Sequence, residues 1–177
     1  MLDTLITNKT RIKLLIKFFL NSRSKSYLRN LEQEFKESSN AIRIELNKFE
    51  KAGLLQSESQ GNKKYFTANT NHPLFNDIHS ILLKHLGIDQ VIDEIITNLG
   101  MLKKVYLVGE FAKGIDSNII DLLLVGADIN KEYLTRLIEK LEKMVSRKVR
   151  YLIFGEEEIK DFLIKKSNTE YLLLWEV

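Results

Sequence analysis

Apolar residues recur every three or four positions through the first fifty residues, which is the spacing of one face of an α-helix. The pattern predicts helices over 9–20, 27–36 and 39–52. At the start of the third helix, Ser38 and Ser39 are candidates for the N-cap, and Gly53 is placed to end it. A tight turn joins the second helix to the third. The pair therefore predicts a helix-turn-helix, whose second member is the recognition helix.

A change of spacing after Gly53 indicates a hairpin. The segments 54–59 and 64–68 have the composition of strands, and between them lies the polar turn Gln60-Gly61-Asn62-Lys63. Pro73 then marks a boundary, because the residue before a proline is pushed out of helical geometry. Two further helical patterns follow over 74–87 and 91–99. From periodicity alone, these helices either form a dimer interface or pack on their own chain.

Strands and helices alternate in the last part of the chain. Apolar strand patterns cover 105–108, 119–125 and 149–154, helical patterns cover 131–145 and 156–166, and an apolar stretch covers 171–177. Such alternation is typical of a small α/β or α+β domain. We therefore expect an α+β protein with a DNA-binding unit over 1–72, linking helices over 73–100 and an α/β domain over 101–177.

Charge is distributed unevenly between these parts. Residues 1–72 hold 13 Lys and Arg against 7 Asp and Glu, or +6, whereas residues 73–177 hold 14 against 17, or −3. A basic segment attracts the phosphate backbone of a nucleic acid, although a solvated basic face is the plainer alternative. The chain has no Cys, no secretory signal and no apolar run long enough to cross a membrane, so we expect a cytoplasmic protein.

The third predicted helix has a polar face opposite its apolar residues. An outward amide, guanidinium and amide there have the reach and the donors to read base edges in a major groove. For base contacts we therefore expect Ser39, Asn40, Arg43 and Asn47. For phosphate contacts we expect Arg29, Lys63 and Lys64.

The order of helix, helix-turn-helix and hairpin, with the segment KFEKAGLLQSESQGNKKYF, resembles winged-helix transcriptional regulators of the ArsR and MarR kind. The resemblance covers about residues 5–75. It implies that the partner is double-stranded DNA and that a homodimer addresses two half-sites.

A second motif lies in the segment YLVGEFAKGIDSNIIDLLLVG, residues 106–126, which resembles the signature of nucleotidyltransferases in their minimal form. The positions that match in order are Gly109, Lys113, Gly114, Ser117 and Asp121. In that family a pair of carboxylates binds a divalent metal that bridges the nucleotide phosphates.

The sequence departs from this signature at the positions that carry the chemistry. Glu110 stands where the family has Ser, and the first carboxylate is replaced by Ile119 or, in an alternative alignment, by Asn118. The third carboxylate is expected on the strand over 148–154, where the chain has Lys148, Arg150 and Tyr151. A lone Asp121 is a poor cage for Mg²⁺. We therefore expect a vestigial site at 109–121, with no catalytic residue, no metal and no cofactor.

Taken together, the patterns predict a DNA-binding transcriptional regulator whose nucleotidyltransferase-like domain is inactive and serves sensing or dimerisation. The effector is unknown. Two alternatives stay open from the sequence: an active minimal nucleotidyltransferase that carries a DNA-binding arm, and a protein-interaction module.

Overall fold

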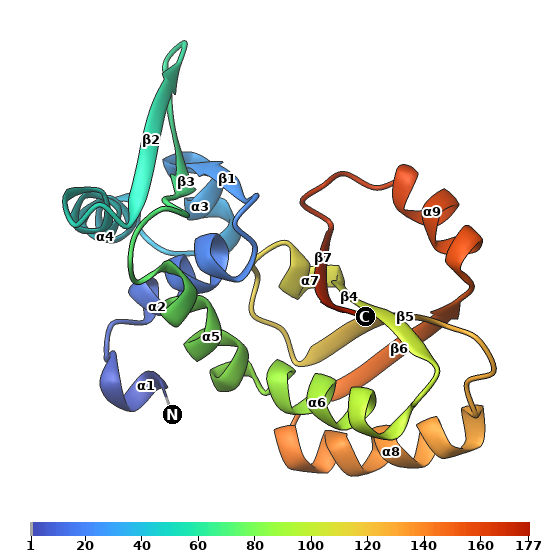
Figure 1. Cartoon of the computed structure of the whole chain (residues 1–177). Coiled ribbons are helices and arrows are strands. Elements are labelled where there is room, and N and C mark those ends of the chain that lie inside the picture. The colour runs from blue at the N-terminus through green and yellow to red at the C-terminus, as the bar shows by residue number, and fades with distance from the viewer. Residues whose placement is uncertain (1) are drawn as a thin grey trace. The chain divides into compact units, whose positions relative to one another are not determined.

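The computed structural model describes residues 2–177, and the chain divides into two compact units that meet in sequence between His85 and Leu86. Each unit contains helices and strands, so the predicted α+β class is confirmed (Figure 1). Within residues 2–177, no helix is long and apolar enough to span a membrane. The finer division at 72 and 100 remains a prediction.

Helices form most of the N-terminal unit. Their bounds are Leu2–Leu5 (α1), Lys9–Leu15 (α2), Leu28–Phe35 (α3), Ser39–Lys51 (α4) and Phe75–Leu86 (α5), with a π-helical turn over Ile16–Leu20 (η1) that continues α2. The Ser38 side chain accepts a hydrogen bond from the backbone N–H of Ala41, which confirms the predicted N-cap of α4. The predicted helix over 9–20 is present, but its second half is π-helical.

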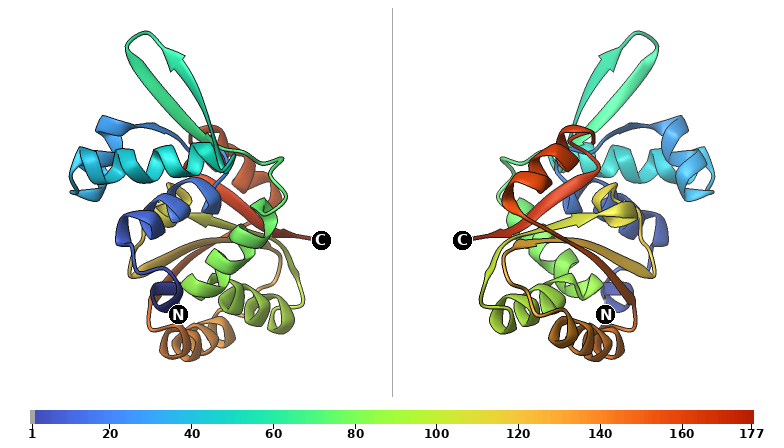
Figure 2. Two further views of the ribbon diagram at one scale, coloured as in Figure 1. Left: turned by 90° about the vertical axis from the view of Figure 1, so that its left-hand side faces the viewer. Right: turned by 90° about the vertical axis from the view of Figure 1, so that its right-hand side faces the viewer.

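A three-stranded antiparallel sheet completes this unit. The strands are Lys25–Tyr27 (β1), Leu55–Gln60 (β2) and Lys63–Ala68 (β3), in the order β1-β3-β2. The predicted helix start at Tyr27 is wrong, because Tyr27 is extended and pairs with Tyr65 across the sheet. The hairpin of β2 and β3 extends beyond α3 and α4 (Figure 2). It turns at Gly61, where a positive φ of 59° favours glycine.

The core of the N-terminal unit joins the helices to the inner face of the sheet. The apolar face predicted for α4 is buried, with Ile42, Leu46 and Phe49 all below a tenth exposed. Phe66 of β3 is buried as well. Because α4 is fixed by this face, its opposite side is presented to solvent in a defined orientation.

A four-stranded sheet organises the C-terminal unit. The strands are Leu102–Val108 (β4), Ile119–Gly126 (β5), Lys148–Phe154 (β6) and Tyr171–Glu176 (β7), in the order β6-β5-β4-β7. Only β5 and β6 are parallel, and helix α8, Lys131–Val145, connects them. The other helices are Ile88–Asn98 (α6), Gly109–Ala112 (α7) and Glu156–Ile164 (α9).

The two faces of this sheet are covered by different helices. Figure 1 shows α6 and α8 on one face and α9 on the other. On the α9 face, Tyr106, Leu123 and Val125 pack against Ile159. Strand residues alternate between faces, so Asp121 lies on the same face as Leu123, toward the start of β5.

Candidate nucleic-acid interface and the Asp121 pocket

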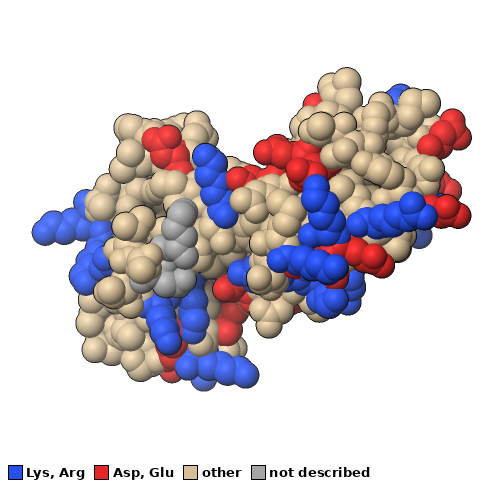
Figure 3. All heavy atoms as spheres, turned by 90° about the horizontal axis from the view of Figure 1, so that it is seen from below, with Lys and Arg blue, Asp and Glu red and all other residues tan. Residues whose placement is uncertain are grey.

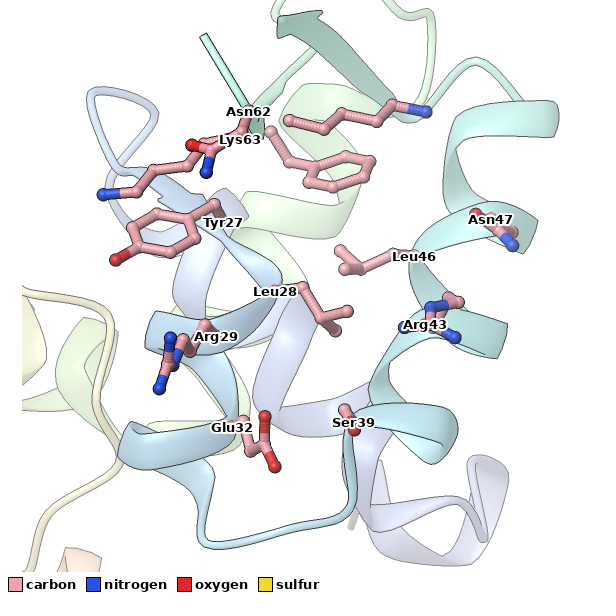
Figure 4. A pocket seen from close by; sticks show the side chains of 12 residues that line it. Tyr27, Leu28, Arg29, Glu32, Ser39, Arg43, Leu46, Asn47, Asn62 and Lys63 are labelled. Carbon is pink, nitrogen blue, oxygen red and sulfur yellow. The ribbon is translucent and has the colours of Figure 1, made fainter. Parts of the chain in front are cut away.

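A groove with a volume of about 680 Å³ lies between α3, α4 and the β2–β3 hairpin (Figure 4). Its floor is apolar and consists of Leu28, Leu46 and Phe66. Its rim is polar, and cationic side chains from three elements contribute to it. The polar and charged residues that line the groove are Arg29, Glu32, Ser39, Arg43, Asn47, Asn62, Lys63 and Lys64.

Six of the seven side chains predicted to contact DNA line this one groove. Ser39, Arg43 and Asn47 follow one side of α4, and Arg29 lies across from them on α3 (Figure 4). Lys63 and Lys64 contribute from β3. The seventh, Asn40, is exposed in the first turn of α4 and is not among the residues that line the groove.

Sequence reasoning missed the aromatic part of this groove. The Tyr27 ring lines it, lies 5.2 Å from the Tyr65 ring between centroids, and has the Lys63 ammonium 4.5 Å from its own centroid. A cation over an aromatic face is attracted by the ring quadrupole, so this contact orients the Lys63 side chain. The aromatic residues of β3 could have indicated an aromatic surface here. Their pairing with Tyr27 depends on β1, a strand that the hydrophobic pattern did not predict.

The cations of the groove differ in how they are paired. Among the side chains that the structure describes, Arg29 and Arg43 form no ion pair, whereas the Lys64 ammonium lies 2.7 Å from a carboxylate oxygen of Glu50 on α4. The hydrogen bond from Lys64 is the main cause that holds the pKa of Glu50 below its ordinary value. On the face drawn in Figure 3, Lys and Arg side chains lie among Asp and Glu side chains. Unpaired guanidinium groups around a groove favour an anionic partner there.

A second, smaller pocket of about 390 Å³ lies in the C-terminal unit, beside the start of β5. Val108, Gly109 and Asp121 line one part of it, and Phe162 and Lys166, from α9 and the residues after it, line another. Arg150 of β6 completes the polar part of the lining.

The Asp121 carboxylate in this pocket is bound on both oxygens by Arg150. Nε of Arg150 donates to Oδ1 at 2.6 Å and Nη2 donates to Oδ2 at 2.9 Å. The two residues are register partners on the parallel strands β5 and β6. The hydrogen bond to Asp121 raises the pKa of Arg150, so the guanidinium stays charged. The sequence placed Arg150 where a third carboxylate was expected, but only the register shows that it pairs with Asp121.

Gly109 allows this carboxylate to approach the backbone closely. Its φ is 71°, and a Cβ at this position would lie 2.3 Å from Oδ2 of Asp121. Only glycine combines that backbone conformation with that contact. Gly109 and Asp121 are therefore the two residues of the predicted vestigial site that the structure brings together.

The other four positions of that predicted site have local structural contacts. Lys113, which caps the C-terminal end of α7, and Glu110 form an ion pair at 3.7 Å, and the Ser117 hydroxyl accepts a hydrogen bond from the backbone N–H of Ile119 at 3.1 Å. Gly114 is buried at a φ of 74°. None of these residues is among those that line the Asp121 pocket.

The residues around Asp121 do not fit a magnesium site. Mg²⁺ requires several oxygen ligands in near-octahedral geometry, and the pocket lining offers one carboxylate whose oxygens both accept bonds from a guanidinium. No group of three described His, Asp or Glu side chains is placed to hold a metal ion.

Comparisons with known proteins give distant structural likenesses only. No family model and no curated protein matches the sequence. Among solved structures, a toxin–antitoxin protein crystallised with AMP-PNP is 21% identical, with 50% of this chain and 73% of that chain covered and a TM-score of 0.38. A Sulfolobus solfataricus protein named "putative nucleotidyltransferase" is 20% identical, with 56% and 86% covered and a TM-score of 0.38. A "possible transcriptional regulator for arsenical resistance" is 20% identical, with 54% and 90% covered and a TM-score of 0.31.

These comparisons correct two predictions made from the sequence. The main reading, a DNA-binding regulator with an inactive second domain, is contradicted, because the likenesses include a protein named as a putative nucleotidyltransferase and toxin–antitoxin proteins. The prediction that the chain is not an enzyme is contradicted by the same proteins. The alternative of a nucleotidyltransferase with a DNA-binding arm is favoured, and the mixed α+β fold is consistent with a small nucleotidyltransferase-like domain. Identities near 20% carry no activity or substrate over to this chain.

Proposed function

We propose that this chain is a nucleotidyltransferase-like protein that carries a duplex-binding arm, and that the arm is a winged-helix unit over residues 1–72. In this proposal α4 enters the major groove of double-stranded DNA and the β2–β3 hairpin follows the backbone. Two copies of the chain bind one palindromic site, which multiplies a modest affinity per unit.

One observation carries this proposal. Three of the four base-reading candidates on α4, and all three phosphate-binding candidates on α3 and β3, line a single groove. Arg43 and Asn47 lie one helical turn apart and present a guanidinium and an amide, which are the groups that read guanine and adenine edges. Arg29 and Lys63 lie on other elements of the same rim, as contacts to flanking phosphates require.

Selection of bound duplexes from a random pool tests this function. The proposal expects an enriched sequence, and enrichment of a palindrome would also support two copies per site. The protein-interaction alternative predicts that the folded chain retains no duplex even at low salt, where nonspecific binding is strongest. That outcome would overturn the proposed function.

For the C-terminal unit we propose nucleotide binding at the Asp121 pocket. The observation that favours it is the Lys166 cation in the lining of a pocket that also includes the strand-to-helix turn at Gly109. Cations beside such a turn suit the phosphates of a nucleotide.

Incubation with labelled nucleoside triphosphates, in the presence of Mg²⁺ or Mn²⁺, tests both binding and transfer at this pocket. Retention of label that is lost in Lys166→Ala supports nucleotide binding. Covalent transfer of label that is lost in Asp121→Ala supports the enzyme. A folded protein that neither retains nor transfers label rules out this second candidate function and leaves duplex binding unaffected.

A further inference from the structure

Glu50 occupies the C-terminal end of the face of α4 that carries the base-reading candidates. Residues 43, 47 and 50 are spaced by four and three positions, so they lie along one side of the helix. This face meets the β2–β3 hairpin at Glu50. A carboxylate at the end of a row that reads DNA is unexpected, because it repels phosphate.

The Glu50 carboxylate is bound by both strands of the hairpin. Nζ of Lys64 on β3 donates to Oε2 at 2.7 Å, and the Ser57 hydroxyl on β2 donates to Oε1. The side chains of Lys64 and Glu50 are 48% and 31% exposed. The pair is therefore accessible to a competing anion.

Lys64 and Lys63 differ in what holds them, although they are neighbours in sequence. Side chains alternate along a strand, so Lys63 points to the outer face of the sheet with Tyr65, and Lys64 points to the inner face with Phe66. The Lys63 ammonium lies against the Tyr27 ring, which leaves its charge uncompensated. The Lys64 ammonium also lies over a ring, that of Phe66, at 5.2 Å from the centroid, but its charge is compensated by Glu50.

We propose that Glu50 is a positioning residue that ties the hairpin to α4 and withholds Lys64 from phosphate, so that a duplex must displace the carboxylate before Lys64 contributes to binding. This inference rests on the proposed duplex-binding function. The two lysines then have different roles in binding. Lys63 is available to attract the phosphate backbone of DNA in the free protein, whereas Lys64 contacts phosphate only after its ion pair with Glu50 has broken.

Duplex titrations of Glu50→Gln, in wild-type and Lys64→Gln backgrounds, test the inference. Glutamine keeps the shape of the side chain and an oxygen for Ser57, but it removes the charge that holds Lys64. We expect Glu50→Gln to tighten binding of a mixed-sequence duplex about two- to fivefold at low salt. The slope of log K against log salt should steepen by about one. In the Lys64→Gln background both effects should shrink, because no lysine charge is then released and only the net charge changes.

If Glu50→Gln changes duplex affinity equally in the wild-type and Lys64→Gln backgrounds, the change comes from net charge alone and the inference is overturned. A second comparison leaves Glu50 in place: Lys63→Gln should weaken binding more than Lys64→Gln, and the reverse order would also contradict the inference. Thermal unfolding of each variant establishes that the binding changes are not losses of fold. If the wild type and every variant fail to bind any duplex at low salt, the proposed function fails and this inference fails with it.

Discussion

Asp121 and Arg150 are register partners on the parallel strands β5 and β6, and their side chains form a two-pronged ion pair with Nε–Oδ1 and Nη2–Oδ2 distances of 2.6 and 2.9 Å. This geometry matches the planar fork of arginine to the two oxygens of a carboxylate. The nucleotidyltransferase signature expects a metal-binding carboxylate on β6. In this chain β6 carries Arg150 instead, and its guanidinium binds the Asp121 carboxylate.

The pair should be detectable as a coupling between the two residues. Arg150 is 65% exposed at its side chain and Asp121 is 17% exposed, so the guanidinium is the more solvated partner. We expect Arg150→Gln to lower the denaturant concentration at the unfolding midpoint slightly, because it removes the ion pair. In an Asp121→Asn background the ion pair is already absent, so the same substitution should lower the midpoint less. Equal effects in both backgrounds would show that the pair contributes nothing to the fold.

Gly109→Ala should destabilise the C-terminal unit. The added Cβ meets the Asp121 carboxylate at 2.3 Å and forces a left-handed backbone on alanine, which together cost about 2–4 kcal/mol. Gly61→Ala is the matched control, because Gly61 has a similar φ of 59° with nothing within 4 Å of the new Cβ. Its expected cost is about 1 kcal/mol. Equilibrium unfolding in urea measures both, and equal costs would contradict the steric role of Asp121.

Arg43→Ala should reduce duplex affinity by about 1–3 kcal/mol and weaken sequence preference, because Arg43 is proposed to read base edges. The comparison uses a duplex enriched from a random pool and an unselected duplex. Arg136→Ala, at an exposed position on α8, is the matched control and should leave affinity unchanged. Equal losses on the two duplexes would assign Arg43 to phosphate contact instead.

Stability of the N-terminal unit should fall at acid pH because of Glu45. This buried carboxylate accepts hydrogen bonds from Arg11 at 2.7 Å and Lys48 at 2.8 Å. The bond from Arg11 is the main cause that lowers the pKa of Glu45 from its ordinary value of 4.5. A lowered pKa in the folded state gives stability that is complete above pH 4.5 and is lost as the pH falls through the folded value.

Urea midpoints measured between pH 7 and pH 3 check this dependence. Glu45→Gln should unfold more easily at pH 7 and show a shallower decline toward pH 3 than the wild type. Glu58→Gln, at an exposed position of the hairpin, should retain the wild-type decline. A decline in Glu45→Gln as steep as in the wild type would assign the acid sensitivity to other carboxylates.

Helices whose apolar residues recur at helical spacing over several turns were predictable from the sequence. The pattern over 131–145 matches α8 at both ends, and the cap at Ser38 followed from residue type, because both depend on neighbours close in sequence. The strand Lys25–Tyr27 was missed because three residues carry too little periodicity. Its extended form depends on pairing with β3, which is distant in sequence.

For the candidate sites too, positions within one helix were predictable and contacts between elements were not. Arg43 and Asn47 could be placed on one face from helical spacing alone. Contacts between elements were not predictable: the Glu50–Lys64 pair depends on where the hairpin lies against α4, and the Asp121–Arg150 pair depends on strand register. The position of Lys166 in the lining of the Asp121 pocket was also not predictable, because it depends on how α9 and the residues after it cover that face of the sheet.

A salt titration of duplex binding tests the central claim most directly. Fluorescence anisotropy of a labelled 20–25 bp duplex, about two turns of DNA, is measured with the full chain from low to physiological salt. The account predicts binding at low salt, with an affinity that falls steeply as the salt concentration rises. In Lys63→Gln the slope of log K against log salt concentration should be shallower by about one. A folded wild-type protein that leaves the anisotropy of the duplex unchanged at low salt would contradict the account.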